Sequence, residues 1–297
     1  MTPPTLEIAL PRERRRAMDF VVLTKPRVLV MILTTTFIGF YLGSPETPDY
    51  LRLFSTLVGT GLAAAGTMAL NQFLERDIDA LMDRTRSRPL PGGRLAPAEA
   101  LLFGTIITLL GLGTLLLAVG PLPALVTAVT VALYLFAYTP LKLRTSLCLV
   151  VGAIPGALPP VTGWVAARGA PSIEAWVLFS ILFLWQLPHT LAIARLYRDD
   201  YARAGIQVLP VIDPDGTSAE RQIVAGCFAL LAVGPLPTLV GLAGPVYFFG
   251  AFALGGALLA AGIAQAVSRS VATARRLMFA SLLYLPALLG LMALDKV

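Results

Sequence analysis

Long stretches without a charged residue constrain the fold of this chain more than any other feature. Five stretches have room for one membrane-crossing helix each, because such a helix needs roughly 20 apolar residues, within about 17–25. The two longest stretches each divide at a Gly/Pro break, Gly120-Pro121 and Gly244-Pro245. The sequence therefore predicts an all-α, polytopic membrane protein with nine transmembrane helices. The uncharged stretches cover residues 28–43, 53–74, 100–141, 145–167, 175–194, 222–268 and 277–294.

The composition agrees with this prediction and leaves little room for a soluble domain. Hydrophobic residues make up 57% of the chain and charged residues only 13%, against about 25% charged in an ordinary soluble domain. The loops are too short to hold a second domain, so we expect an N-terminal tail over residues 1–24 and a single transmembrane domain over residues 25–297. Met1–Leu10 lacks the apolar segment and cleavage site of a signal peptide, which predicts that the first helix is retained.

The placement of Lys and Arg predicts how the chain is oriented. If the N-terminus is cytoplasmic, 20 of the 23 basic residues fall in inner segments, and only Arg52, Arg168 and Lys296 fall in outer ones. Basic residues concentrate in cytoplasmic loops, so this asymmetry predicts a cytoplasmic N-terminus and an external C-terminus in the cell (inner) membrane. The net charge of +6 is thus explained by topology and contact with the lipid bilayer, and no nucleic-acid partner is expected.

Asn71, Glu75 and Asp79 follow one another at intervals of four residues at the end of the second predicted helix. Each step turns about 400° and rises about 6 Å, so the three side chains lie on one helix face. Oxygen-bearing side chains are the ligands that Mg²⁺ prefers, and the ion commonly bridges carboxylates to substrate phosphates. The alternative is a solvated helix end whose acidic groups pair with Arg76 and Arg84.

A second acidic segment, Asp199-Asp200-Tyr201, lies in another inner loop. Asp200 is the better candidate for a second metal ligand, although nearby arginines could equally neutralise both carboxylates in an exposed loop. Lys142, Arg144 and Arg84 are suitable partners for a diphosphate, because arginine offers planar bidentate donors and lysine a point charge. The same basic residues could instead act only as anchors on the positive side of the membrane.

His189 is the only histidine, and it lies within an uncharged helix. Ionisable groups inside a membrane are candidates for function, and imidazole is a common axial ligand of haem iron. Iron ligation, contact with a propionate and proton transfer are all open roles. The plain alternative is an interior hydrogen bond, for example to a backbone carbonyl that Pro188 leaves free.

Several of these segments together resemble the UbiA superfamily of intramembrane prenyltransferases. The first signature of that family is matched by Asn71, Glu75 and Asp79, followed by Arg84-Thr85 and Arg88-Pro89. Other segments resemble the branch of the family that modifies haem, and the similarity extends over most of residues 25–211. These segments are Lys25-Pro26-Arg27, Ala137-Tyr138-Thr139, Lys142 with Arg144-Thr145, Gly156 to Trp164, Trp185-Gln186 with Pro188-His189, and Asp199-Asp200-Tyr201.

The resemblance implies helices bundled around a central cavity that opens at the cytoplasmic face. It also implies Mg²⁺-dependent transfer of a farnesyl group from farnesyl diphosphate to a vinyl group of haem B, with a haem-modifying or terminal-oxidase assembly protein as a possible further partner. Tyr138 is expected to stabilise the allylic cation through its ring face. The expected metal ligands are Asn71, Glu75, Asp79 and Asp200; Lys142 joins them as a catalytic residue, and Arg84, Arg88, Tyr138, Arg144, His189 and Asp199 are expected to bind substrates.

Two other functions stay open at this point. A sibling enzyme of the same family would prenylate an aromatic quinone precursor such as 4-hydroxybenzoate, and His189 with its neighbours speaks against that acceptor. A transporter would place carboxylates along a path near the membrane midplane, whereas the acidic residues here lie at one membrane face.

Overall fold

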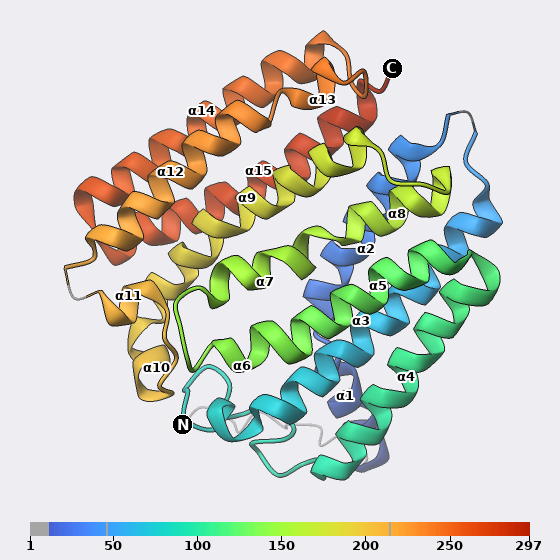
Figure 1. Cartoon of the computed structure of the whole chain (residues 1–297). Coiled ribbons are helices and arrows are strands. Elements are labelled where there is room, and N and C mark those ends of the chain that lie inside the picture. The colour runs from blue at the N-terminus through green and yellow to red at the C-terminus, as the bar shows by residue number, and fades with distance from the viewer. Residues whose placement is uncertain (1–11, 46, 214) are drawn as a thin grey trace, which may run out of the picture.

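The computed structural model of the protein describes residues 12–45, 47–213 and 215–297 (Figure 1). The prediction that Met1–Leu10 is no signal peptide therefore concerns residues outside this description. In the described ranges the chain is helical, and one stretch, η1, has the wider turn of a π-helix. In chain order the elements are α1 (Arg12–Leu23), α2 (Pro26–Gly43), α3 (Tyr50–Asp79), α4 (Pro97–Ala118), α5 (Pro121–Ala132), η1 (Leu133–Tyr138), α6 (Thr139–Leu141), α7 (Cys148–Ala157), α8 (Pro159–Arg168), α9 (Ile173–Leu196), α10 (Arg198–Arg203), α11 (Leu209–Ile212), α12 (Thr217–Val233), α13 (Leu236–Leu239), α14 (Pro245–Ser268) and α15 (Val271–Leu294).

Nine spans within the described ranges are long and apolar enough to cross a membrane, which confirms the predicted number. Six spans are single helices. The other three are built from pieces, namely α5 with η1 and α6, α7 with α8, and α12 with α13. The predicted breaks separate α4 from α5 and α13 from α14, and Pro121 and Pro245 each begin a helix. Proline fits there because the first N–H groups of a helix have no intrahelical partner.

The helices form two packed groups that meet around α7 (Figure 1). One group contains α9, α12, α14 and α15, and the other contains α2, α3, α4, α5 and α8. A cavity of about 460 Å³ lies between them, lined by residues of α2, α3, α5, η1, α7, α8, α9 and α15. The predicted bundle around a central cavity is therefore present.

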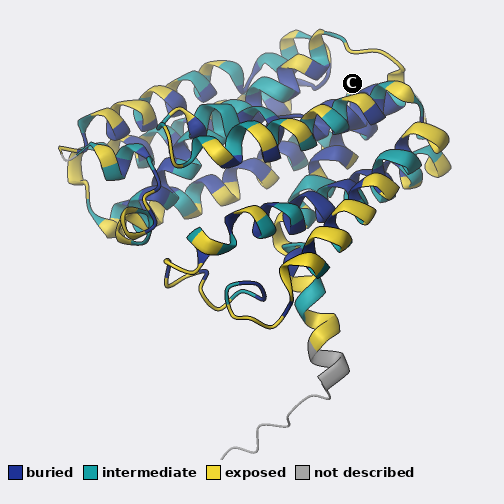
Figure 2. Ribbon diagram, turned by 60° about the horizontal axis from the view of Figure 1, so that its bottom comes forward, coloured by how far each residue is buried: buried dark blue, intermediate teal, exposed yellow. Residues whose placement is uncertain are grey.

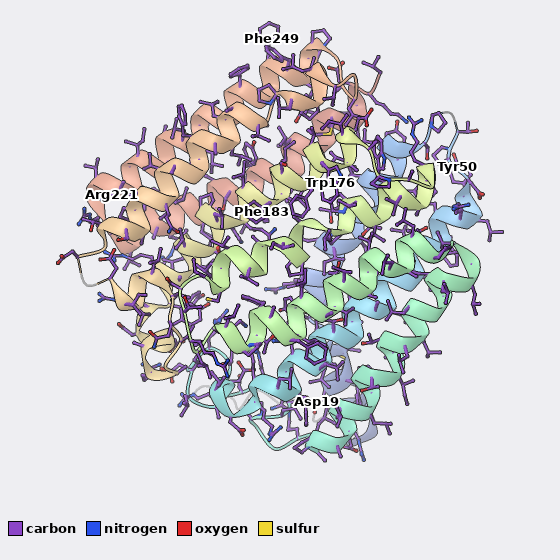
Figure 3. The ribbon with its side chains drawn as sticks, viewed as in Figure 1. Asp19, Tyr50, Trp176, Phe183, Arg221 and Phe249 are labelled. Carbon is purple, nitrogen blue, oxygen red and sulfur yellow. The ribbon has the colours of Figure 1, made fainter. Side chains whose placement is uncertain are left out.

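The outward faces of the helices are exposed (Figure 2), and many of their exposed residues are large and apolar. Leu117 and Phe136 are 88% and 77% exposed, and Phe249 points away from α14 (Figure 3). An apolar surface of this extent is unfavourable in water and is expected where the surrounding medium is lipid. The chain is therefore a polytopic membrane protein whose outer faces contact the bilayer.

Close helix contacts depend on glycine. In α4, a Cβ atom on Gly111 would lie 2.3 Å from the backbone nitrogen of Ala63 in α3. In α8, a Cβ atom on Gly163 would lie 2.0 Å from the backbone oxygen of Thr36 in α2. Small residues allow the backbones of membrane helices to approach closely, and the resulting van der Waals contact holds these helix pairs together.

The predicted tail contains a helix that packs against the bundle. The rings of Phe20 in α1 and Phe103 in α4 lie 4.9 Å apart. Arg94 Nε lies 2.9 Å from Asp19 Oδ1, and the Gln72 side chain donates a 2.9 Å hydrogen bond to the carbonyl oxygen of Leu23. From Asp19 onward the segment is therefore attached to α3 and α4, which the sequence did not predict.

Polar contacts join the connections at each end of the bundle. At one end, Arg203 pairs with Asp83 at 2.6 Å, and Arg269 Nη1 donates to the carbonyl oxygen of Asp215 at 2.7 Å. At the other end, Lys296 Nζ donates to the carbonyl oxygen of Ser44 at 2.6 Å. The candidate site lies at the first of these ends, where α3 finishes.

Candidate active site

The last turns of α3 bring three oxygen-bearing side chains together. Asn71, Glu75 and Asp79 are 0%, 7% and 1% exposed, and they lie on the buried face of the helix. The four-residue spacing therefore has the structural consequence that the sequence predicts. Burial of two carboxylates is costly unless each is paired with an opposite charge or a metal ion.

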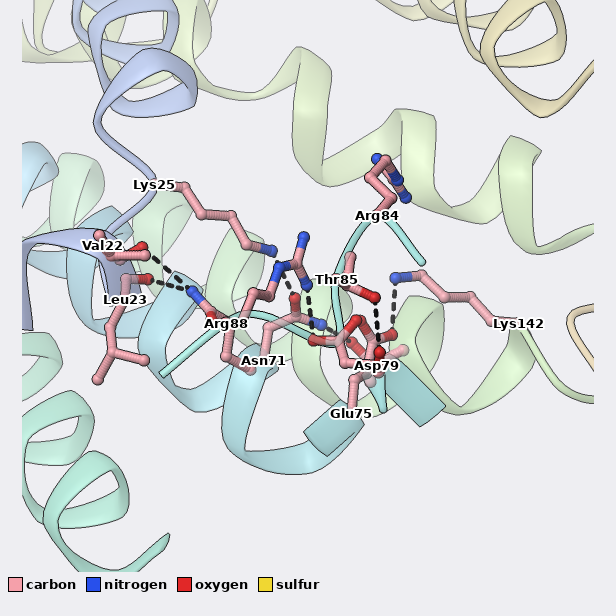
Figure 4. Close-up of polar contacts among 12 residues, drawn as sticks. Val22, Leu23, Lys25, Asn71, Glu75, Asp79, Arg84, Thr85, Arg88 and Lys142 are labelled. Atoms are coloured by element: carbon pink, nitrogen blue, oxygen red, sulfur yellow. Dashed lines mark hydrogen bonds and ion pairs between the residues drawn. The ribbon is translucent and has the colours of Figure 1, made fainter. Parts of the chain in front are cut away.

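Each member of the trio contacts one cationic side chain (Figure 4). Lys25 Nζ donates to Asn71 Oδ1 at 2.9 Å. Lys142 Nζ lies 2.6 Å from Glu75 Oε1, and Arg88 Nη1 lies 2.6 Å from Asp79 Oδ2. The two carboxylates are thus neutralised by cations from two different connections of the chain.

The alternative of a solvated helix end does not fit this geometry. Arg76 pairs with Asp77 on the exposed side of α3, at 3.6 Å. Arg84 instead places its guanidinium over the rings of Tyr197 and Tyr201, at 4.9 and 5.7 Å from their centroids. Neither arginine pairs with the trio in the described structure.

The loop after α3 folds back over the trio. The hydroxyl of Thr85 is buried and donates to the backbone oxygen of Asp79 at 2.8 Å. This bond ties the loop to the end of α3, and Arg88 of the same loop contacts the carboxylate of Asp79. Thr85 and Arg88 of the family signature therefore contact the same site as its Asn and acidic positions, whereas Arg84 lies over Tyr197 and Tyr201.

Lys25 is a site residue that the sequence analysis did not identify. It contacts Asn71 across 46 residues, a separation that gives no local signal of a contact. Its φ of 49° is uncommon for a residue with a side chain, and such strained residues cluster at functional sites. Burial, together with the charges of Arg88 and Lys142, lowers the pKa of the Lys25 amine to about 7.

Lys142 behaves in the opposite way because it pairs directly with a carboxylate. Burial acts against its charge, but Tyr138 and Glu75 outweigh this effect and raise the pKa of Lys142 above its usual value. Its ammonium also lies 4.5 Å from the centroid of the Tyr138 ring. Asn71, Glu75 and Asp79 form a charged cluster with Lys25, Lys142 and Arg88. Lys142 and Tyr138 therefore mark the boundary between this charged cluster and the cavity.

A π-helical turn presents two tyrosines to this boundary. In η1 the backbone N–H of Thr139 bonds to the carbonyl oxygen of Tyr134, five residues earlier, and Pro140 has no N–H with which to continue an α-helical pattern. Tyr134 and Tyr138 both line the cavity. A Cβ on Gly152 would lie only 2.5 Å from the Tyr138 ring, so this glycine makes room for it. Such π-turns occur frequently at functional sites.

Asp200 belongs to a second, neighbouring cluster. Its carboxylate pairs with Arg203 and accepts hydrogen bonds from the backbone N–H groups of Asp83 and Arg84, at 3.3 and 3.4 Å. The aspartate thus holds the loop that carries Arg84 and Arg88. No three His, Cys, Asp or Glu side chains gather as a metal site in the part of the chain that the structure describes, so its assignment as a metal ligand beside Glu75 and Asp79 stays a prediction.

Two other predicted residues lie apart from both clusters. Asp199 and Arg144 are exposed, and neither side chain forms a hydrogen bond or an ion pair with a described residue. Their roles in substrate binding also stay predictions.

His189 lies on α9, where it lines the cavity together with Trp185 and Gln186. Its Nδ1 lies 2.8 Å from the hydroxyl oxygen of Ser281 in α15. In the described structure the imidazole therefore bonds to a side chain of another helix, and not to a backbone carbonyl freed by Pro188. Ser281 is a residue that the sequence analysis missed, since nothing in its local sequence marks it.

Comparison with known proteins relates these features to a family. Residues 32–283 match the model of the UbiA prenyltransferase family. The protoheme IX farnesyltransferase of Solibacter usitatus is 49% identical over 94% of this chain and 98% of its own length. The enzyme of the same name from Aquifex aeolicus is 39% identical, over 94% and 95% of the two chains.

Solved structures share the fold at low sequence identity. A digeranylgeranylglyceryl phosphate synthase structure superposes with a TM-score of 0.80 at 16% identity, over 95% of this chain and 98% of that one. A UbiA homolog from Archaeoglobus fulgidus bound to GPP and Mg²⁺ superposes with a TM-score of 0.64 at 17% identity, over 92% and 99%. The fold, the signature residues and these similarities lead to one conclusion: the chain belongs to the UbiA prenyltransferase family.

Proposed function

We propose that this chain is a protohaem IX farnesyltransferase, which transfers the farnesyl group of farnesyl diphosphate to a vinyl group of haem B. Water supplies a hydroxyl group, and haem O and diphosphate are the products. The observation that carries this proposal is the near-complete coverage of relatives of that name at up to 49% identity. The charged cluster beside an apolar cavity supports it, because a prenyl diphosphate has one charged end and one apolar tail. These relatives favour haem over the quinone precursor and over transport.

The donor atoms of the site suit Mg²⁺. Asn71, Glu75 and Asp79 offer one amide oxygen and two carboxylates, all buried, and hard cations prefer such oxygen ligands. The homolog from Archaeoglobus fulgidus that shares the fold binds Mg²⁺ with GPP. When bound, the ion stabilises the negative charge that develops on the diphosphate as it leaves. Asp200 is proposed as a further ligand.

The cationic residues bind the diphosphate in this proposal. Lys25, Lys142 and Arg88 are already held at the trio by its oxygens, so their donors are in place before the substrate arrives. Arginine can contact two phosphate oxygens at once, whereas lysine acts as a point charge. Arg84 and Arg144, on exposed loops of the same end, are proposed to contact the outer phosphate, and Asp199 is proposed as a further substrate-binding residue.

The cavity holds the isoprenoid tail and excludes water from the reacting carbon. Tyr138 and Tyr134 line the cavity, and the Tyr138 ring also contacts Lys142 of the charged cluster, so both rings lie near the place where the allylic carbon would become positively charged as the diphosphate leaves. An aromatic face attracts a cation. His189, deeper along the cavity wall, is proposed to bind the acceptor haem.

The proposal extends to the cellular setting. The Lys/Arg asymmetry supports the cell inner membrane as location, with the tail of residues 1–24 cytoplasmic and the C-terminus of the 25–297 domain outside. A haem-modifying or oxidase-assembly protein is the proposed recipient of haem O, because the product is too apolar to diffuse freely through water.

The test is to express the chain in bacterial membranes that lack a farnesyltransferase of this kind and to measure the masses of the extracted haems. We expect a haem heavier than haem B by one farnesyl and one hydroxyl group, together with unchanged masses of the quinone precursors. Inserted, abundant protein with haem B as the only haem would contradict the proposed acceptor, and a prenylated quinone precursor would identify the alternative.

A further inference from the structure

The contacts of His189 determine how its imidazole ring is held at the cavity. Its Nδ1 lies 2.8 Å from Ser281 Oγ, across the interface of α9 and α15. Ser281 is fully buried, so water cannot substitute for either partner. Which atom donates in this bond decides which imidazole nitrogen carries the hydrogen.

The second hydrogen bond of Ser281 answers that question. Its hydroxyl donates to the backbone oxygen of Met278 at 2.7 Å. A serine hydroxyl has one hydrogen to donate and lone pairs to accept with. Because the hydrogen is used on Met278, the bond to His189 requires Nδ1–H as the donor and Ser281 Oγ as the acceptor.

Trp185 fixes the orientation of the same ring. Its indole stacks on the imidazole with 4.8 Å between centroids and 15° between planes. The indole N–H also donates to the backbone oxygen of Ser281 at 2.7 Å. The imidazole is therefore held in its plane by Trp185 and along its edge by Ser281.

The other imidazole nitrogen is then an electron-pair donor. With the hydrogen on Nδ1, a neutral ring has a lone pair on Nε2, and Nε2 forms no hydrogen bond with any residue that the structure describes. His189 lines the cavity. A lone pair there can bind a metal centre but cannot donate a hydrogen bond to a propionate, which separates two of the roles left open by the sequence.

We propose that Ser281 is a positioning residue that holds His189 as the Nδ1–H tautomer, so that Nε2 can bind the iron of the acceptor haem. The inference rests on the proposed function for the identity of the acceptor. When a residue that hydrogen-bonds the outer nitrogen of a metal-binding histidine is mutated, the metal affinity commonly falls by about 10–100-fold. Ser281 occupies that place here.

The tautomer can be measured without haem, because His189 is the only histidine of the chain. The full-length protein, purified with a tag that lacks histidine and labelled with ¹⁵N-histidine, gives one pair of imidazole nitrogen signals. We expect a protonated Nδ1 and an unprotonated Nε2 in the wild type and in Ser281→Thr, and loss of this preference in Ser281→Ala. An Nε2–H tautomer in the wild type would overturn the proposal whatever the acceptor proves to be.

Haem titration, followed by absorbance, tests the second part of the proposal, that Nε2 of His189 binds the haem iron. We expect Ser281→Ala to weaken haem binding by about 10–100-fold, Ser281→Thr to retain it, and His189→Ala to lose the imidazole-ligated spectrum until free imidazole is added. Ser180→Ala is the matched control, because Ser180 also bonds a backbone oxygen of its own helix but does not touch the ring. Nδ1–H in the absence of haem binding would refute the proposed acceptor and leave the positioning role intact. Imidazole-type ligation that is unchanged in Ser281→Ala would refute that role.

Discussion

Asp79 combines burial, an ion pair and a place at the end of α3. Its carboxylate contacts Arg88 at 2.6 Å, whereas the carboxylate of Asp77, two residues earlier, is 85% exposed and pairs with Arg76 alone among the described residues. The two aspartates share one helix end but differ in environment. Substitutions at the two positions therefore separate the effect of losing a carboxylate in the site from the effect of losing a negative charge at the surface.

We expect Asp79→Ala, and equally Asp79→Asn, to lower prenyl transfer by at least about 10²-fold, because the carboxylate charge that is proposed to bind the metal ion and that holds Arg88 in the site is lost. Asp77→Ala should keep nearly full activity. Transfer of a labelled farnesyl group, together with protein abundance in the membrane, measures both effects. Retained turnover of Asp79→Ala, with an unchanged dependence on Mg²⁺, would show that the trio is not the metal site.

Lys25 and Arg269 are the two described residues other than glycine with positive φ, at 49° and 50°. A left-handed backbone costs a residue with a side chain roughly 1–2 kcal/mol, and glycine avoids that cost. Lys25 lies inside the charged cluster, whereas Arg269 lies in the loop between α14 and α15. A comparison of the two residues therefore separates the effect of the Lys25 side chain on the site from the effect of the left-handed backbone itself.

Substitution by glycine removes this backbone cost at both positions but also removes the hydrogen bonds of Lys25 to Asn71 and of Arg269 to Asp215, so we expect the thermal midpoint in detergent to change little. Lys25→Gly should in addition weaken binding of a farnesyl diphosphate analogue by about tenfold, because a charge-assisted hydrogen bond contributes roughly 1.5–3 kcal/mol. Arg269→Gly should bind the analogue normally. Calorimetric titration of both variants measures the affinities, and equal affinities would remove Lys25 from the diphosphate site.

At the scale of elements, α3 and α4 are held in register by glycines whose neighbours are backbone atoms. A Cβ atom on Gly111 would lie 2.3 Å from Ala63 N and 2.6 Å from Gly59 O, whereas a Cβ atom on Gly113 would meet nothing within 4 Å. Both Gly111 and Gly113 belong to α4. Their difference is therefore one of packing and not of helix propensity.

Gly111→Ala should separate the two helices and destabilise the protein by about 1–3 kcal/mol, the usual cost of overpacking. Gly113→Ala should leave the stability of the protein unchanged or raise it slightly, because alanine is the better helix former. The thermal midpoint in detergent measures each change. Equal midpoints for the two variants would mean that α4 can move away from α3 without cost.

At the scale of the whole molecule, an odd number of spans places the two chain ends on opposite sides of the bilayer. The described part of the chain has nine such spans, and its polar connections form two groups at the two ends of the bundle. The group that contains Asp83, Arg203 and Arg269 is the one with most of the basic residues. That end is expected to face the cytoplasm.

Reporter domains inserted at Gly92 and Thr217 should therefore give a cytoplasmic signal, and a fusion at Val297 a periplasmic one. An insertion at Gly169, in an exposed loop at the opposite end of the bundle, is the control and should agree with Val297. Fluorescent and phosphatase reporters measured in parallel give each side a positive signal. A cytoplasmic signal at Val297 would contradict the orientation.

Much of this architecture follows from the sequence because its rules are local. A segment within lipid must satisfy its own backbone hydrogen bonds, so an apolar stretch of sufficient length becomes a helix, and Gly120-Pro121 divides two such helices. The helical period likewise places Asn71, Glu75 and Asp79 on one face. The family signature then indicates the chemistry of that face.

Contacts between distant segments were decided only by the tertiary structure. Lys25 meets Asn71 across 46 residues, and Lys142 meets Glu75 across 67 residues, because the packing of the helices brings these distant segments together. The bond between His189 and Ser281, which joins two different helices, arises in the same way. A local pattern determines which way a side chain faces on its own helix, but the packing of all helices determines which partner it meets there.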